Sequence, residues 1–137
     1  MEFSEAFANI NWLSVVVACI GAFILGALWY SPLLFSKAWQ KEVGLSDEDL
    51  KDSNMVKTFG TSFVLQFIAA VMMDMFMGNE ATLTFGLIVG AIVGVGWVAT
   101  SLGTNYLFSH RSLKLFFIDA GYFVVWFMLI GLILGAW

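Results

Sequence analysis

The chain has 137 residues, of which 61% are hydrophobic and only 12% are charged. A water-soluble protein of this length could not bury so much apolar surface, whereas lipid solvates the outward faces of membrane helices. The formal net charge of −4 argues against nucleic-acid binding, because phosphate contacts need clustered Lys and Arg. With one proline and no low-complexity tail, residues 1–137 are expected to form a single transmembrane domain.

Four apolar segments are long enough to cross the hydrocarbon core as helices, which takes about 20 residues. They cover residues 11–30, 58–77, 83–106 and 115–137. The apolar runs are continuous rather than alternating, which excludes membrane-spanning strands. The N-terminal tail carries Glu2 and Glu5 and no basic residue, unlike a cleaved signal peptide, so the first segment is expected to be retained. The sequence therefore predicts an all-α membrane protein, a bundle of four transmembrane helices.

The loop after span one has an internal order of its own. Tyr30-Ser31-Pro32 predicts the end of the first helix, because proline disfavours helix at the preceding residue. Apolar residues between Leu33 and Trp39 recur at roughly helical spacing, which predicts a short helix in the membrane interface. Gly44 is its expected stop, and Ser46 is the expected N-cap of a second short helix that leads into span two.

Basic residues are confined to the two loops that follow spans one and three. They are Lys37, Lys41, Lys51, Lys57, Arg111 and Lys114. The positive-inside rule places these loops in the cytoplasm and both termini on the non-cytoplasmic side of an inner membrane. Aromatic residues fit this orientation, since amphipathic rings prefer the interfaces. Trp12 and Trp137 are expected at the outer interface, and Trp29, Tyr30 and Tyr106 at the inner one.

Spans one and three end alike, in Leu25–Tyr30 and Leu102–Tyr106, and spans two and four share a shorter similarity in Leu65–Ala70 and Leu115–Ala120. Each pair crosses the membrane in the same direction. This pattern fits two parallel helix hairpins related by an axis along the membrane normal. Chance similarity between short apolar segments is the alternative.

Several segments together resemble a known family. They are Asn11-Trp12-Leu13, Leu25–Pro32, Lys37-Ala38-Trp39, Ile118–Tyr122 and Gly131–Trp137. In this order they are similar to a family of small bacterial membrane proteins, domain of unknown function 1761. The resemblance covers almost the whole chain and implies a four-helix membrane fold. It implies no activity.

Asp119 is the main candidate for a functional residue, because a carboxylate about one turn inside span four must face protein or water, pair, or be protonated. Other polar residues are expected at similar depth and could complete a pocket open to the cytoplasm. They are Tyr122, Thr100, Thr104, Asn105, Gln66 and Tyr30. The functional interpretation is a proton or cation site, or an anchor for a substrate. The structural alternative is an interhelical hydrogen-bond network that holds the bundle together.

Asp74 is a secondary candidate near the outer end of span two, where solvation at the interface is a sufficient explanation. Its separation from Asp119 argues against a catalytic pair. The methionines around it suit gap-filling better than a copper site. They are Met72, Met73, Met75 and Met77. Cys19, the only cysteine, is interpreted as a small hydrophobe, and His110 as an exposed loop residue.

Small residues form stripes at four-residue spacing in three spans. They are Gly86, Gly90 and Gly94; Ala18, Ala22 and Gly26; and Gly131 with Gly135. Such stripes let helix backbones approach closely, within one chain or between chains. Together with the lack of a soluble domain they favour a homo-oligomer, and a dimer is the preferred oligomeric state.

No phosphate-binding loop, nucleophile elbow, zinc motif or dinucleotide fingerprint is present, so no enzyme activity, catalytic residue, cofactor or metal is expected. Two classes of function stay open. One is transport or permeation of a small solute or ion. The other is a non-transporting protein that binds a lipid or a protein partner, or scaffolds a complex, with structural polar residues.

Overall fold

The computed structural model describes residues 2–137, and all regular structure among them is helical. Four helical segments are long and apolar enough to cross a membrane. They are α2 (Trp12–Trp29), α5 (Met55–Met77), the continuous run Leu83–Phe108 and α8 (Leu113–Gly135). The predicted fold class is confirmed, and each predicted span begins and ends within a few residues of the observed one.

The third span changes its helical type in the middle. It consists of α6 (Leu83–Val93), a π-helical segment η1 (Gly94–Ala99) and α7 (Thr100–Phe108). The hydroxyl of Thr100 donates to the carbonyl oxygens of Gly96 (2.9 Å) and Trp97 (3.1 Å), which gives the carbonyls of the wider turn a partner. The sequence predicts a helical span over residues 83–106 but does not indicate this change of helical type.

The short helices at the ends of the spans agree with the predicted loop order, with two differences. α3 (Ser36–Val43) ends at Gly44, whose φ of 75° is the left-handed conformation that glycine adopts readily. Ser46 caps α4 (Asp47–Lys51), and its hydrogen bonds hold the pKa of Asp49 below the usual value. However, α4 stops at Lys51, and Asn54 caps α5 separately. α1 (Phe3–Ala8) was not predicted.

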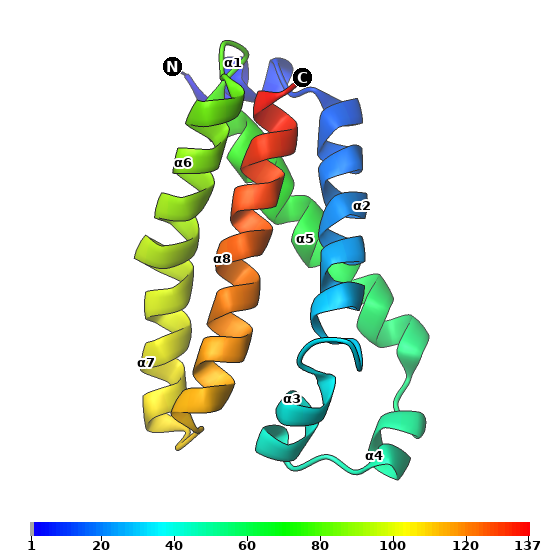
Figure 1. Ribbon diagram of the computed structural model, residues 1–137. Coiled ribbons are helices and arrows are strands. Elements are labelled where there is room, and N and C mark those ends of the chain that lie inside the picture. Colours follow the sequence, from blue (N-terminus) through cyan, green and yellow to red (C-terminus); the bar gives the residue numbers. More distant parts are fainter. Residues whose placement is uncertain (1) are drawn as a thin grey trace.

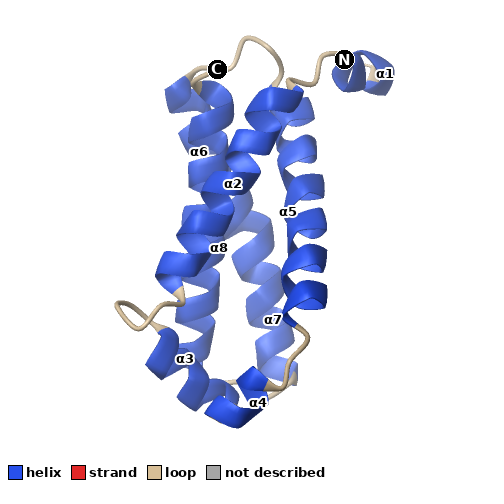
Figure 2. Ribbon diagram, turned by 90° about the vertical axis from the view of Figure 1, so that its right-hand side faces the viewer, coloured by secondary structure: helices blue, strands red, loops and turns tan. Residues whose placement is uncertain are grey.

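Figures 1 and 2 show the arrangement of the helices. α6 and η1 lie side by side with α8, α7 approaches α8 less closely, and α2 lies on the other side of α8. α5 crosses the bundle at an angle, so that its first half diverges from α8. Both termini lie at one end of the molecule, and α3, α4 and the loop between α7 and α8 lie at the other. The two basic loops therefore share one end, as expected because they follow spans one and three, which run in the same direction.

Backbone contact between α6 and α8 is the tightest packing in the molecule. A Cβ atom added to Gly86 would lie 1.9 Å from the carbonyl oxygen of Gly131, and one added to Gly90 would lie 2.3 Å from that of Phe127. One added to Gly135 would lie 2.4 Å from the carbonyl oxygen of Thr82. The glycine stripe of span three is thus used within the chain, against α8.

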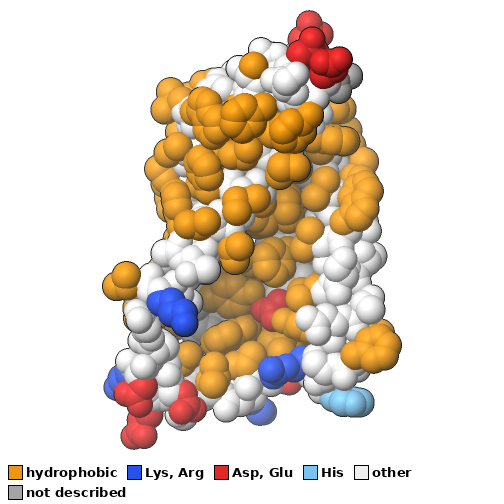
Figure 3. Space-filling view, turned by 180° about the vertical axis from the view of Figure 1, so that it is seen from behind, with side chains coloured by type: hydrophobic (Ala, Val, Ile, Leu, Met, Phe, Trp, Pro, Cys, Tyr) orange, Lys and Arg blue, Asp and Glu red, His pale blue; other side chains and the backbone are white. Residues whose placement is uncertain are grey.

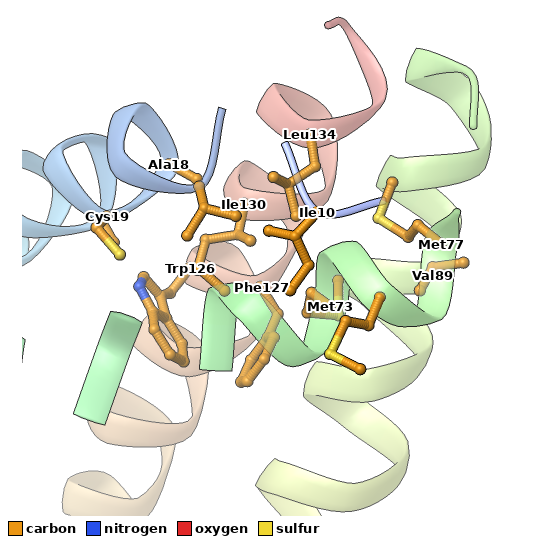
Figure 4. Close-up of a cluster of buried hydrophobic side chains, with 14 of the residues drawn as sticks. Ile10, Ala18, Cys19, Met73, Met77, Val89, Trp126, Phe127, Ile130 and Leu134 are labelled. Atoms are coloured by element: carbon orange, nitrogen blue, oxygen red, sulfur yellow. The ribbon is translucent and has the colours of Figure 1, made fainter. Parts of the chain in front are cut away.

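The apolar core fills the half of the bundle that contains the termini. Val15, Ala18 and Cys19 of α2 are fully buried, as is Ile130 of α8. Figure 4 shows side chains from α2, α5, α6 and α8 directed toward one another in this region. In α5 only the second half contributes buried residues, the first of them Ala70. The opposite half of the bundle is therefore more open.

The two helix hairpins proposed from the sequence similarity do not pack alike. α6 and α8 lie against each other along their length, whereas α2 and α5 cross and separate. The internal repeat stays a prediction.

The α6–α8 contact gives a first testable prediction. Gly86→Ala is expected to lower the free energy of unfolding by about 1–3 kcal/mol or more, because the added methyl group overlaps the backbone of α8. Gly60→Ala in α5 is the matched control, since nothing lies within 4 Å of the added Cβ and alanine favours helix. Thermal unfolding of the purified protein followed by circular dichroism measures both variants. Equal stability of the two variants would contradict the close approach.

Candidate functional site

Asp119 lies in α8, where it is 7% exposed, and both of its carboxylate oxygens accept hydrogen bonds from tyrosines. The hydroxyl of Tyr30 donates to Oδ1 at 2.6 Å, and the hydroxyl of Tyr106 donates to Oδ2. Tyr30 follows the last residue of α2, and Tyr106 lies near the end of α7. Three spans are thus joined through one carboxylate.

The end of span one brings a second hydrogen-bond donor to the same turn of α8. Trp29 Nε1 donates to the carbonyl oxygen of Ile118 at 3.0 Å. The chain turns at Ser31, and its backbone nitrogens at Ser31 and Phe35 bond back to Leu28 and Trp29. This tight turn before α3 fixes the two aromatic rings at the end of α2 against α8.

Aromatic rings surround the Tyr30 side of Asp119. The ring of Tyr30 packs edge-to-face on Tyr122 of α8, with centroids 5.2 Å apart, and on Trp39 of α3, with centroids 5.9 Å apart. Trp29 lies 6.4 Å from Tyr122 and 4.9 Å from Phe35. These five residues, Trp29, Tyr30, Phe35, Trp39 and Tyr122, are called the aromatic cluster below.

The position of α3 beside this site depends on Ser112, the N-cap of α8. Its hydroxyl accepts from the backbone nitrogen of Leu115 (3.1 Å) and donates to Glu42 Oε2 (2.7 Å). Glu42 belongs to α3, so one hydroxyl starts α8 and holds α3 against it. The result is that Trp39 stays over Tyr30.

Gln66 and Tyr122 lie where the sequence analysis expected them, next to the Asp119 site. Tyr122 is buried, and its hydroxyl lies against span one, 2.9 Å from the Cβ position of Gly26. The amide of Gln66 lies beside the same hydroxyl. The carbonyl oxygen Oε1 of Gln66 is buried and has no hydrogen-bond partner among the described residues. The site therefore contains an unused acceptor.

Thr100, Thr104 and Asn105 were predicted to belong to the pocket, and this is wrong. All three are exposed on the outside of α7. Thr100 bonds to carbonyls of η1, and Thr104 donates to the carbonyl of Thr100 at 2.9 Å. Their face was not predicted correctly, because the π-helical segment changes the direction of every side chain that follows it. A hydroxyl that bonds to its own helix needs no interhelical partner.

Tyr106 was interpreted as an interfacial anchor, and its contact with Asp119 was missed. A signal was present in the sequence, since the similar ends of spans one and three both place aromatic donors at one depth. In the structure these ends supply Trp29, Tyr30 and Tyr106 to residues 118 and 119 of α8.

Asp74 has a structural role at the opposite end of the bundle. Its Oδ2 accepts from the backbone nitrogen of Asn11 at 3.0 Å, and the Asn11 side chain caps α2 by accepting from Ser14. The carboxylate thereby ties α5 to the start of α2. Met73, Met75 and Met77 belong to the buried core, as the gap-filling interpretation predicts, whereas Met72 is exposed and fills no gap within the chain.

A hollow of about 470 Å³ borders the first half of α5. Its lining is polar and consists of Asn54, Lys57, Thr58, Thr61 and Ser62. Asn54, Thr58, Ser62 and Gln66 are spaced four residues apart, so they share one helix face that leads from the loop end of the molecule to Tyr122. Figure 3 shows the molecule hollowed in this half, with mostly hydrophobic side chains and an acidic side chain around the polar residues of α5.

The tyrosine contacts of Asp119 give a second prediction. Tyr106→Phe is expected to lower the free energy of unfolding by about 1–3 kcal/mol, because it removes a hydrogen bond to a buried acid. Thr104→Val is the control from the same helix, since its hydroxyl is exposed and bonds only to its own helix. Thermal unfolding compares the two. If Thr104→Val cost as much as Tyr106→Phe, the proposed partners of Asp119 would be wrong.

Comparison with known proteins identifies the family but no activity. A family model described as a protein of unknown function, DUF1761, matches residues 13–135, nearly the whole chain. No curated protein and no solved structure matches the sequence significantly. The matched region contains α2 except its first residue, all of α5 and α8, and both tyrosines that contact Asp119. The chain therefore belongs to the DUF1761 family of proteins of unknown function.

Proposed function

We propose that this protein transports a small solute or ion across the inner membrane and that Asp119 is the group that binds it. The observation that carries the proposal is a buried carboxylate within a spanning helix, held by hydroxyl groups from two other spans. Ionisable groups are costly in hydrocarbon and mark ion or substrate pathways more often than they serve packing alone. We propose no enzymatic step.

The polar face of α5 supplies a path to this carboxylate. Asn54, Thr58, Ser62 and Gln66 continue from the loop end of the molecule toward Tyr122, which lies one helical turn from Asp119. Toward the termini the path meets the packed core around Cys19 and Ile130. In this arrangement the site has access from the end with the basic loops only, and transport requires a second arrangement that opens the other end.

Tyr30 and Tyr106 would then act as exchangeable partners of the carboxylate. While the site is empty, their hydroxyls satisfy both oxygens of Asp119 and limit the cost of its burial. An arriving proton or cation replaces one of these hydrogen bonds. Because each tyrosine comes from a different span, its release loosens contact between spans and couples binding to movement.

The proposal includes a homo-oligomer, and a dimer is the preferred oligomeric state. The glycine stripe of span three no longer supports it, since that stripe contacts α8 of the same chain. The open side of the bundle does support it. α5 packs mainly on α2, and its first half carries exposed apolar side chains, among them Val56 and Phe59, that a second copy would cover.

The structural alternative has one observation in its favour. Both oxygens of Asp119 already have partners from separate spans, which is also what a purely stabilising network requires. Under this alternative the protein binds a lipid or protein partner, or scaffolds a complex, without transporting anything.

Flux in proteoliposomes tests transport. We expect Asp119→Asn to keep the fold, because asparagine is nearly isosteric and its oxygen still accepts a hydrogen bond, and to reduce solute or proton flux at least about tenfold, because the charge is lost. Asp74→Asn is the matched control, and its flux should stay near that of the native protein. Native mass spectrometry of each variant checks that the oligomer, a multiple of the 15.2 kDa chain, is unchanged.

Unchanged flux in Asp119→Asn, or no flux above that of empty liposomes for protons and for solutes of either charge, contradicts transport. Loss of stability in Asp119→Asn together with unchanged flux supports the structural alternative.

Topology is tested by labelling in intact cells. A cysteine at Glu2 is expected to react with a membrane-impermeant maleimide, and a cysteine at Lys51 is not, because the positive-inside rule puts the basic loops in the cytoplasm. The native chain with Cys19 alone is the blank, since Cys19 is fully buried. Reaction at Lys51 and not at Glu2 would reverse the orientation.

A further inference from the structure

We infer that the Asp119 site takes a protonated amine with an apolar substituent. The inference rests on the proposed function, because it names the solute that the same site would bind. A measurement of equilibrium binding tests it without any measurement of transport. Its basis is the combination of one buried carboxylate, an unused carbonyl acceptor and the aromatic cluster.

The charge and number of the oxygen ligands point to an organic cation rather than to Mg²⁺ or Ca²⁺. Asp119 is the one carboxylate in the spans at this end of the bundle, whereas Mg²⁺ and Ca²⁺ take six or more oxygen ligands. Within residues 2–137, no three His, Cys, Asp or Glu side chains are grouped closely enough to hold a metal ion. A single carboxylate suffices for an ammonium group, which needs one counter-charge and a few acceptors.

The aromatic cluster provides the rest of an ammonium site. Tyr30 lies between Tyr122 and Trp39, with Trp29 adjacent, so aromatic faces and edges stand on one side of the carboxylate. Aromatic faces attract organic cations through their quadrupole, most strongly where water is excluded. Trp39 is the most accessible test position, because it belongs to α3, outside the spans.

The side-chain oxygen of Gln66, unpaired within residues 2–137, favours an amine over a quaternary ammonium group as the ligand. Its Oε1 is buried without a partner, and the only groups that can satisfy it are hydrogen-bond donors. A protonated amine carries N–H groups that Gln66 Oε1 or Asp119 can accept, whereas a quaternary ammonium carries none. The unused acceptor therefore favours a primary or secondary amine.

The surface around the hollow explains the apolar substituent. The α5 residues that line the hollow are polar, whereas the side chains that surround it in Figure 3 are mostly hydrophobic. Lys57 borders the hollow, and the backbone nitrogen of Arg111 donates to the carbonyl oxygen of Tyr106 at 2.9 Å. An inorganic cation meets these two positive charges with no compensating apolar contact. A cation with an aryl or alkyl group gains apolar contact on the way to Asp119.

Isothermal titration calorimetry on the purified native protein in neutral-lipid nanodiscs at pH 7 tests the inference. The probes are 2-phenylethylammonium, the uncharged 2-phenylethanol and the anion 3-phenylpropanoate. We expect saturable binding of the ammonium at least about tenfold tighter than binding of the alcohol, and no binding of the anion. Asp119→Asn should abolish the preference for the cation, and Trp39→Leu should weaken cation binding about three- to tenfold.

Asp74→Asn is the control, and it should bind the ammonium as the native protein does. Equal binding of ammonium and alcohol by the native protein overturns the inference, as does unchanged ammonium binding in Trp39→Leu. The comparison of ammonium binding between Trp39→Leu and the native protein remains informative even if Asp119→Asn fails to fold. Ammonium binding without flux would leave the inference standing and remove the transport proposal, while Asp119-dependent flux of another solute without ammonium binding would do the reverse.

Discussion

The close approach of α6 to α8 is the contact on which the rest of the structure depends. Lipid is as apolar as a leucine side chain, so helices in a membrane gain little from hiding apolar surface, and association must come from close packing and polar contacts. Gly86, Gly90 and Gly131 remove the side chains that would separate the two backbones. α8 is thereby fixed in the middle of the bundle, and its remaining faces receive α2 and α5.

This central position makes the two halves of the bundle different. Toward the termini, apolar side chains of α2, α5 and α6 close around Ile130 and its neighbours in α8. Toward the basic loops, α5 diverges and the packing is replaced by hydrogen bonds to Asp119 and by the aromatic cluster. Cohesion there depends on a few polar contacts, which a ligand can exchange, whereas tight apolar packing cannot be exchanged in the same way. The features that stabilise this half are thus the ones that the proposed ligand would contact.

Sequence reasoning located the important positions along the membrane normal better than around each helix. The depth of Asp119, Gln66, Tyr122 and Tyr30 follows from counting residues from the loops, and these residues do meet in the structure. The faces of Thr100 and Thr104 could not be found this way, because η1 alters the helical repeat before them and nothing in the apolar sequence signals a π-helix. The missed residue Tyr106 lies after the same segment.

The sequence by itself determined the number and limits of the spans, the common end of the two basic loops and the presence of a buried carboxylate. These follow, in that order, from hydrophobic length, from the distribution of charge and from the cost of an ion in hydrocarbon, which are all properties of the chain. The family resemblance added the same fold. Only the tertiary structure decided that the glycine stripe of span three packs within the chain, that α5 diverges to leave a hollow, and that Tyr106 rather than Thr100 contacts Asp119. These depend on the rotation and tilt of each helix. In a membrane all faces of an apolar helix are equally acceptable to lipid, so the sequence pattern carries little information on which face meets a neighbour.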